Sequence, residues 1–127
     1  MVRQSIIAGL ASLMIGAAAC SSHHRSAAVP PPEPVELTVN NSNYLDVDVF
    51  AVRGTSRGRV GSVTGLSTAT FHVPVAYTPD GNLQLLVDPI GSSSTYMTDK
   101  IAVGPGVHVE LTVTAVLRMS SYAVWAK

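Results

Sequence analysis

Between residues 35 and 127, apolar and polar side chains alternate along several short stretches, and no stretch has the spacing of an amphipathic helix. The clearest stretch is residues 107–114, where three valines and a leucine alternate with His, Glu and two threonines. A period of two places apolar side chains on one face of a β-strand and polar side chains on the other. Residues 35–40 and 45–52 follow the same pattern, which predicts two further half-buried strands.

Shorter runs of β-type residues, separated by Gly, Pro, Asn and Ser, occur between these stretches and after them. They predict strands at residues 59–64, 67–73, 83–87, 97–103 and 122–126. Gly61 is expected to mark a β-bulge, and the almost entirely apolar run 83–87 is expected to be buried on both faces. About seven or eight strands at a spacing of ~8–12 residues predict an all-β fold, a single antiparallel β-sandwich of the immunoglobulin-like kind.

Residues 1–19 have the pattern of a secretory signal peptide. Arg3 is their only charged residue, an apolar run covers residues 6–19, and small residues end the run. The run is shorter than the ~20 apolar residues that a membrane-spanning helix needs. We therefore expect residues 1–19 to be removed from the mature protein.

Cys20, the only cysteine of the chain, directly follows three alanines and precedes two serines. This arrangement resembles the lipobox of bacterial lipoproteins, with Ala17 at a position where leucine is usual. The resemblance implies cleavage before Cys20 and a diacylglycerol on its thiol, and Ser21 implies the outer membrane, on its periplasmic face. Two or more acyl chains anchor a protein stably without a membrane-spanning helix. An ordinary signal peptide cut at the alanine run is the alternative.

Residues 20–34 are predicted to be a lipidated cysteine followed by a disordered tether. The fourteen residues 21–34 include four prolines and almost no large apolar side chain. A polyproline II chain rises ~3.1 Å per residue, so this tether can hold a domain ~40 Å from the lipid. His23 and His24 lie within it and, as a flexible pair without a third ligand, are expected to be solvated rather than bound to a metal. The folded domain is expected to be residues 35–127.

The charge of the chain argues against one class of partner. Eight Lys and Arg balance eight Asp and Glu, and 13% of residues are charged, about half the usual fraction. Binding to nucleic acid needs a clustered basic face, so no nucleic acid is expected as a partner. A single cysteine also excludes an internal disulfide framework and a Cys-based zinc site.

The turn Gly104-Pro105-Gly106, placed just before residues 107–114, resembles the closing hairpin of small secreted sandwich domains of the transthyretin-like kind. This resemblance covers ~15 residues and bears on the fold alone. Taken as a whole, the chain is similar to small uncharacterised bacterial lipoproteins, a resemblance that implies no activity.

The sequence does not predict an enzyme. Nothing in it places His72 or His108 beside a serine nucleophile and an orienting carboxylate. Both histidines fall on predicted strands, at positions that are expected to face solvent. We therefore expect neither enzymatic activity nor a cofactor.

Two clusters of charge offer contact sites, each with a simpler interpretation. Arg53, Arg57 and Arg59 surround the first predicted hairpin loop, residues 54–58. There they can contact phosphate groups of lipid or lipopolysaccharide, or an acidic partner, or only keep the loop soluble. Asp46 and Asp48 share one strand face and can contribute oxygen ligands to calcium. A position on the solvent-exposed face of a sheet explains the two aspartates equally well. No metal is therefore expected.

Residues 91–96 carry four hydroxyl side chains and a tyrosine, and can contact a sugar or a peptide. Together with the predicted anchor and tether, these observations predict a lipid-anchored, non-enzymatic cell-envelope protein. It is expected to act as a structural or protein-interaction module, held to the membrane through Cys20 and contacting an envelope protein. The alternative is a glycan- or peptide-binding module that uses the loops at one end of the sandwich.

Overall fold

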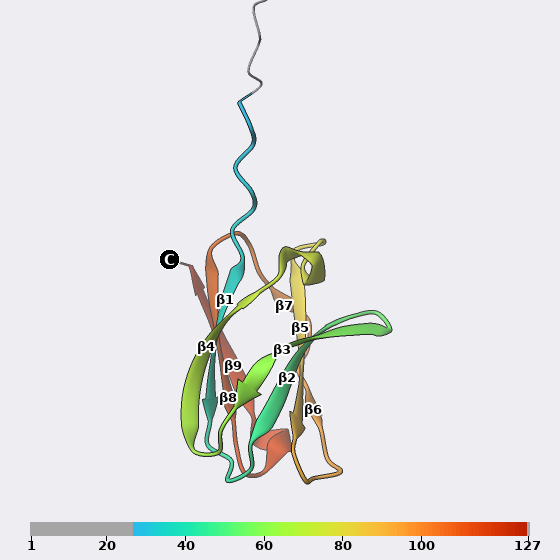
Figure 1. Ribbon diagram of the computed structural model, residues 1–127, viewed down its shortest axis with the longest axis vertical. Coiled ribbons are helices and arrows are strands. Elements are labelled where there is room, and N and C mark those ends of the chain that lie inside the picture. Colours follow the sequence, from blue (N-terminus) through green and yellow to red (C-terminus); the bar gives the residue numbers. More distant parts are fainter. Residues whose placement is uncertain (1–26, 127) are drawn as a thin grey trace, which may run out of the picture.

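The computed structural model describes residues 27–126, which form an all-β sandwich (Figure 1). This part of the chain has nine strands in two sheets and two short 3-10 helices, η1 (Val75–Tyr77) and η2 (Leu117–Met119). The prediction of an all-β sandwich is confirmed. The predicted signal peptide, Cys20 and the beginning of the predicted tether lie outside the described residues.

The first sheet has the strand order β4-β1-β8-β9. Its strands are β1 (Val35–Asn41), β4 (Ser67–Val73), β8 (Val107–Val113) and β9 (Ser121–Ala126). β4 and β9 run antiparallel to their neighbours, but β1 and β8 run parallel to each other. The prediction of purely antiparallel pairing is therefore wrong for this pair. Alternation along a strand fixes which face a side chain takes, but not which strand lies beside it.

The second sheet has the order β3-β2-β5-β6, and β7 pairs with the other end of β5. Its strands are β2 (Val47–Arg53), β3 (Ser56–Val63), β5 (Asn82–Pro89), β6 (Tyr96–Met97) and β7 (Ile101–Ala102). Along β2, Val49 pairs with Gly61 but Phe50 pairs with Arg59. The bulge expected at Gly61 is thus confirmed, and Val60 is the extra residue.

Thr98 interrupts the strand that the sequence predicts over residues 97–103. Its side chain is buried, and its Oγ1 accepts a hydrogen bond from the N–H of Leu85 at 3.0 Å. Its own N–H donates to the carbonyl of Leu85 at 2.9 Å. A side-chain oxygen thus takes the place of a backbone acceptor, and the predicted single strand is wrong: β6 and β7 keep two residues each.

The hairpin between β2 and β3 is tighter than the sequence predicts. In place of a loop over residues 54–58, Gly54 and Thr55 form the turn, and pairing resumes at Ser56. Gly54 has a φ of +58°, a left-handed conformation that glycine adopts without strain. The hairpin is consequently long, and it projects from the body of the sandwich (Figure 1).

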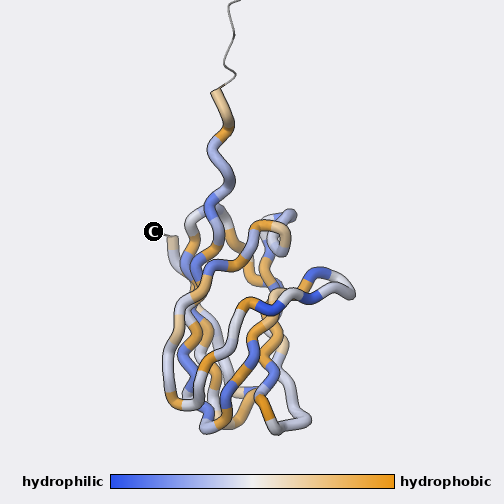
Figure 2. The backbone as a smooth tube through the Cα atoms, in the orientation of Figure 1, coloured by the Kyte–Doolittle hydropathy of each residue, from blue (hydrophilic) through white to orange (hydrophobic). Residues whose placement is uncertain are grey.

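The core lies between the two sheets and consists almost entirely of Val and Leu. Inward and outward positions alternate along the central strands, which is visible as alternating colours in Figure 2. The buried cluster comprises Val35, Leu37, Val39, Val47, Val49, Ala51, Val63, Val73, Leu83, Leu85, Val87, Ile101, Val109, Leu111 and Val113. On the outward face of β5, Leu86 is only 8% exposed, so the prediction that residues 83–87 are buried on both faces is confirmed.

The two ends of the sandwich differ. Residues 27–34 are exposed, have no helix or strand, and lead away from the start of β1 (Figure 1). The opposite end, called the distal end below, is formed by the loops 42–46, 64–66, 90–95 and 114–120. Among the described residues, none of the helices has the length and apolar character needed to span a bilayer.

Candidate functional site

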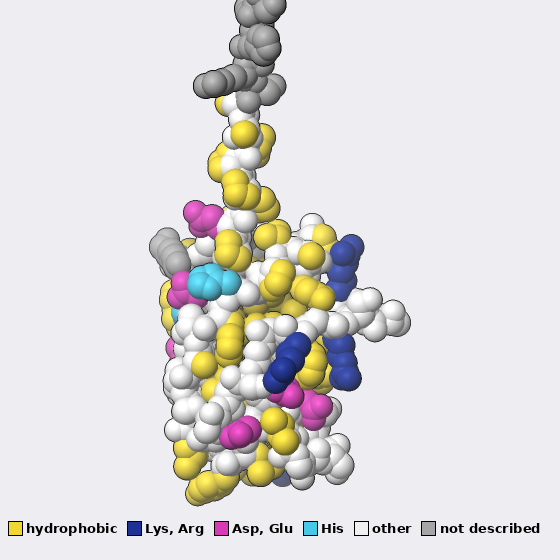
Figure 3. All heavy atoms as spheres, viewed as in Figure 1, with side chains coloured by type: hydrophobic (Ala, Val, Ile, Leu, Met, Phe, Trp, Pro, Cys, Tyr) yellow, Lys and Arg dark blue, Asp and Glu magenta, His cyan; other side chains and the backbone are white. Residues whose placement is uncertain are grey.

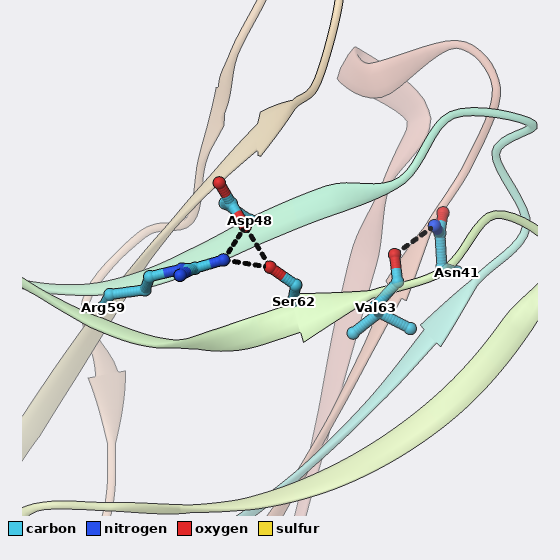
Figure 4. Close-up of polar contacts among 5 residues, drawn as sticks. All are labelled: Asn41, Asp48, Arg59, Ser62 and Val63. Carbon is cyan, nitrogen blue, oxygen red and sulfur yellow. Dashed lines mark hydrogen bonds and ion pairs between the residues drawn. The ribbon is translucent and has the colours of Figure 1, made fainter.

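Asn41, at the end of β1, holds the loops of the distal end together from inside. Its side chain is 1% exposed, and its Nδ2 donates to the carbonyl oxygens of Leu45 at 2.9 Å and Val63 at 3.3 Å. Figure 4 shows this side chain pointing at the Val63 carbonyl on β3. Its Oδ1 accepts a hydrogen bond from the N–H of Asn43 at 3.0 Å. A buried amide with these partners fixes the loop that follows β1.

Asn43 and Ser120 extend this network to the loop after β8. Asn43 accepts from the N–H of Leu45 at 3.0 Å through Oδ1 and donates to the Thr114 carbonyl at 3.3 Å through Nδ2. Ser120 Oγ accepts from the N–H of Thr114 at 3.1 Å. The N–H of Leu45 donates to Asn43 Oδ1 and is therefore not available to pair with a neighbouring strand. This explains why the strand predicted over residues 45–52 begins two residues late.

A cleft of about 460 Å³ opens at the distal end between three of its loops. Residues that line it include Ser92, Ser94, Thr95, Arg118, Leu45 and Val116. The hydroxyl-rich run 91–96 therefore contributes three hydroxyl groups to the cleft, and the N–H of Ser94 is already bonded to Ser92 Oγ at 3.1 Å. Arg118 is the charged side chain of the lining, so the cleft offers neutral hydrogen-bonding groups beside one cation.

Large apolar side chains stand exposed at the same end. Tyr44 is 79% exposed, Leu66 64%, Ile90 54%, Val116 49% and Met119 68%. These five residues, called the distal rim below, come from all four distal loops, and hydrophobic side chains are visible at the bottom of Figure 3, where those loops lie. Exposed apolar clusters on a soluble domain are typical of contact surfaces. Sequence analysis missed the rim, because an apolar loop residue carries no local signal of exposure.

Leu66 adopts a backbone conformation that leucine rarely takes. Its φ is +58°, and among the described residues it is the one non-glycine with a positive φ. Its N–H donates to the carbonyl of Asn43 at 3.0 Å. The preceding Gly65 lies so close to the neighbouring loop that a Cβ would come within 2.2 Å of the Tyr44 carbonyl oxygen. The left-handed conformation costs ~1–2 kcal/mol for a residue with a Cβ, and such strain concentrates at functional sites.

Arg59 is paired with side chains of β2 and β3 on the outer face of the second sheet. Its Nη2 lies 2.7 Å from Asp48 Oδ1, and Ser62 Oγ hydrogen-bonds with both groups (Figure 4). The hydrogen bond from Ser62 and, after it, the hydrogen bond from Arg59 lower the pKa of Asp48 below its ordinary value of 3.8. The pair joins β2 to β3 close to the bulge, and its partners explain the position of Arg59 without an external ligand.

The other two arginines also contact the protein. The Arg57 guanidinium lies over the Phe50 ring, 4.9 Å from its centre, and Arg53 donates from Nη1 to the Ala76 carbonyl at 3.3 Å. Figure 3 shows Lys and Arg side chains around the projecting hairpin, but the contacts of the three arginines lead in different directions. At the predicted contact site, Arg53, Arg57 and Arg59 each therefore have a partner within the protein. The Arg59 side chain is still 58% exposed.

The two aspartates that were expected to share a strand face have separate partners. Asp46 lies before β2, and its Oδ1 accepts the N–H of Gly65 at 2.8 Å, whereas Asp48 is paired with Arg59. Among residues 27–126, no group of three or more His, Cys, Asp or Glu is placed to hold a metal ion. The arrangement gives the calcium interpretation no support.

His108 is less exposed than the sequence predicts. Its side chain is 13% exposed, because its Nδ1 lies 2.9 Å from Glu36 Oε1 and its ring stacks on Trp125 with the ring centres 4.6 Å apart. The expectation that His108 faces solvent is therefore wrong. His108 lies on the outward face of the sheet, but Glu36 and Trp125 cover its side chain. His72, on β4, is exposed as predicted.

Residues 54–58 read Gly-Thr-Ser-Arg-Gly and so match the spacing of a nucleophile elbow. That motif requires a sharp turn from a strand into a helix. Here the residues form the turn and first part of a β-hairpin, with Ser56 paired to Arg53. The match is therefore a coincidence of composition in a glycine-containing turn.

Comparisons with known proteins leave the family open. No family model matches the sequence, and no curated protein matches it significantly. Among solved structures, the fold is similar to an NMR structure of a protein from Eubacterium rectale. The two chains are 11% identical, with a TM-score of 0.46 over 75% of this chain and 91% of that one. A likeness at this level carries no argument about function.

Proposed function

We propose that this protein is a non-enzymatic lipoprotein of the bacterial cell envelope, anchored to the outer membrane through Cys20, whose distal end binds an envelope protein. The observation that best supports this function is the opposition of the two ends. Residues 27–34 leave the sandwich at one end, and the distal rim and the cleft lie at the other.

The physical properties of the distal end support a role in binding. Its loops are held by the buried side chains of Asn41, Asn43 and Ser120, so docking a partner would cost little additional ordering of the backbone. The distal rim offers apolar area whose removal from water contributes roughly 25 cal/mol per Å². A tether of ~40 Å would keep this end clear of the lipid surface.

Site-specific photo-crosslinking in bacterial membranes tests this function. A photoreactive residue at Val116, on the rim, should form a discrete adduct with another envelope protein, and Met119→Ser should reduce its yield. The matched control is the same photoreactive residue at Ala102, an exposed position on β7 near the tether end. Equal adducts from both positions, or no effect of Met119→Ser, would contradict binding through the distal end.

A second candidate function rests on the cleft itself. Three hydroxyl side chains beside Arg118 suit a small glycan or peptide that carries a carboxylate. A bound ligand raises the stability of the fold by RT ln(1 + [L]/Kd), so cell-wall glycan fragments and short peptides can be screened by thermal unfolding. A ligand of this site should lose its effect in Arg118→Gln and keep it in Lys100→Gln. If both variants kept the stabilisation by the ligand, or if both lost it, binding of the ligand in the cleft would be contradicted.

A further inference from the structure

β9 is the last strand of the first sheet among the described residues. It pairs with β8 in an unbroken register of six residues, from Ser121 opposite Thr112 to Ala126 opposite Val107. Trp125 of β9 also stacks on His108 of β8, which adds a side-chain contact between the two strands. In the described part of the chain, no strand pairs with the other side of β9. Such an edge presents a row of backbone donors and acceptors to another strand.

The other edges of the sandwich are protected in recognisable ways. β3 carries Arg57 and Arg59 and is bent by the bulge at Val60. β4 follows β3 after a short turn and packs beside it, which closes that side of the sandwich. The edge formed by β6 and β7 is broken into two dipeptides, with Asp99 and Lys100 between them. Charge, bulges and short strands are the usual means of preventing edge-to-edge pairing.

β9 has none of these protections. Its sequence, Ser-Tyr-Ala-Val-Trp-Ala, contains no charged residue and no proline. Its apolar side chains are poorly covered on both faces. On the inward face, Tyr122 is 37% and Val124 41% exposed, and on the outward face Trp125, beside His108, is 45% exposed. A free strand with this composition gains both hydrogen bonds and apolar burial when it is paired.

We propose that β9 pairs with β9 of a second copy of this chain, antiparallel across a two-fold axis, so that two four-stranded sheets become one sheet of eight. The lack of charge favours a second copy over other occupants, because at a two-fold axis every side chain meets its own counterpart or a near neighbour and any charge would be repelled. With the axis at Ala123, Tyr122 pairs with Val124 of the other copy, and with the axis at Val124, Tyr122 pairs with Ala126. Both registers keep inward side chains on the inward face.

This pairing is compatible with anchoring in one membrane. The antiparallel arrangement places the two segments 27–34 at opposite ends of the dimer. A strand of seven residues spans ~23 Å, which is less than the ~40 Å that the predicted tether can reach. An interface of one strand pair is small, so we expect a weak dimer in dilute solution that is favoured where both copies share a membrane surface.

Disulfide trapping of the full chain in bacterial membranes tests the proposal. Ala123→Cys and Val124→Cys each introduce one thiol on β9, and residues directly opposite in an antiparallel pair lie within the Cα separation of a disulfide. One of the two variants should form a covalent dimer on mild oxidation. The matched control is Thr68→Cys, an exposed position on β4 at the other edge of the same sheet, which should remain monomeric.

The same variants made on a Cys20→Ser background separate this proposal from the proposed function. Dimers of the wild-type chain, which depend on Cys20, would argue against lipidation without bearing on β9. Dimers from Thr68→Cys as abundant as those from β9, no dimer from either β9 variant on both backgrounds, or an adduct with a different protein would each overturn pairing with a second copy.

Discussion

The N–H of Leu66 donates to the carbonyl of Asn43 at 3.0 Å and so joins two loops of the distal end. This bond accompanies the left-handed backbone of Leu66, which leaves its apolar side chain 64% exposed. A leucine held in a strained conformation in order to face solvent is difficult to explain by folding alone. The proposed contact with a partner would account for both the strain and the exposure.

Leu66→Gly separates stability from binding at this site. Glycine removes ~1–2 kcal/mol of strain and adds ~0.5–1 kcal/mol of backbone entropy cost, so the free energy of unfolding should stay unchanged or rise slightly. The yield of the Val116 crosslink should fall, because an apolar contact is lost. Denaturant unfolding and crosslinking yield measure the two effects. A destabilised variant with an undiminished crosslink would show that Leu66 serves the fold and not the partner.

Asn41→Ala should destabilise the domain through the loss of its buried network. Carbonyl groups of the loop and of β3, together with the N–H of Asn43, lose their partner in this variant, at a cost of ~1–3 kcal/mol. For a domain of this size, each kcal/mol lowers the Tm by about 4–8 °C. The neighbouring Asn40, on the outward face of β1, provides the control, since Asn40→Ala should change stability by less than about 0.5 kcal/mol. Equal effects in calorimetry would contradict this role.

Thr98 gives a test of the break between β6 and β7. Thr98→Val keeps the shape of the side chain but leaves the buried N–H of Leu85 without its acceptor, which should cost ~1–3 kcal/mol. Thr98→Ser keeps the hydroxyl and should cost less. The comparison is made by urea unfolding of both variants. If Thr98→Val were as stable as the wild type, the hydroxyl would not be what replaces the backbone acceptor.

Asp48→Asn should lower the free energy of unfolding by an amount that depends on pH. The hydrogen bonds from Ser62 and Arg59 lower the pKa of Asp48 in the folded state, so its carboxylate stabilises the fold above the unfolded pKa of about 3.8. This contribution is lost as the pH falls through the lowered pKa. The wild type should exceed Asp48→Asn by up to about 1 kcal/mol near neutral pH, the range for a partly exposed ion pair. The difference should disappear in strong acid, and a constant difference across a pH series of unfolding curves would exclude the pair as its source.

The β-strands with strict alternation could be predicted from the sequence, because one buried face imposes a period of two. β1 and β8 occur where this pattern predicts them, and β2 begins two residues later than predicted. The parallel pairing of β1 with β8 could not be predicted, since neighbours in a sheet depend on contacts far apart in the chain. The break at Thr98 depends on a single hydroxyl that points inward, which no local pattern indicates.

The candidate site was predictable only in part. The hydroxyl run 91–96 indicated a contact loop from composition, and Ser92, Ser94 and Thr95 of this run line the cleft. The distal rim gave no signal, because Tyr44 and Met119 resemble core residues until their loops are placed. The arginine cluster was prominent in sequence, yet Arg59 turned out to be paired with Asp48. Side-chain partners that lie across strands decide whether a charge is available, and these follow only from the register.

The mass of the N-terminal peptide, taken from protein in bacterial membranes and compared with a Cys20→Ala variant, tests the anchored module most directly. We predict that the mature chain begins at Cys20 with two or three acyl chains, and that Cys20→Ala is released from the membrane fraction. A mature chain with an unmodified N-terminus, recovered in the soluble fraction like the variant, would contradict anchoring through Cys20.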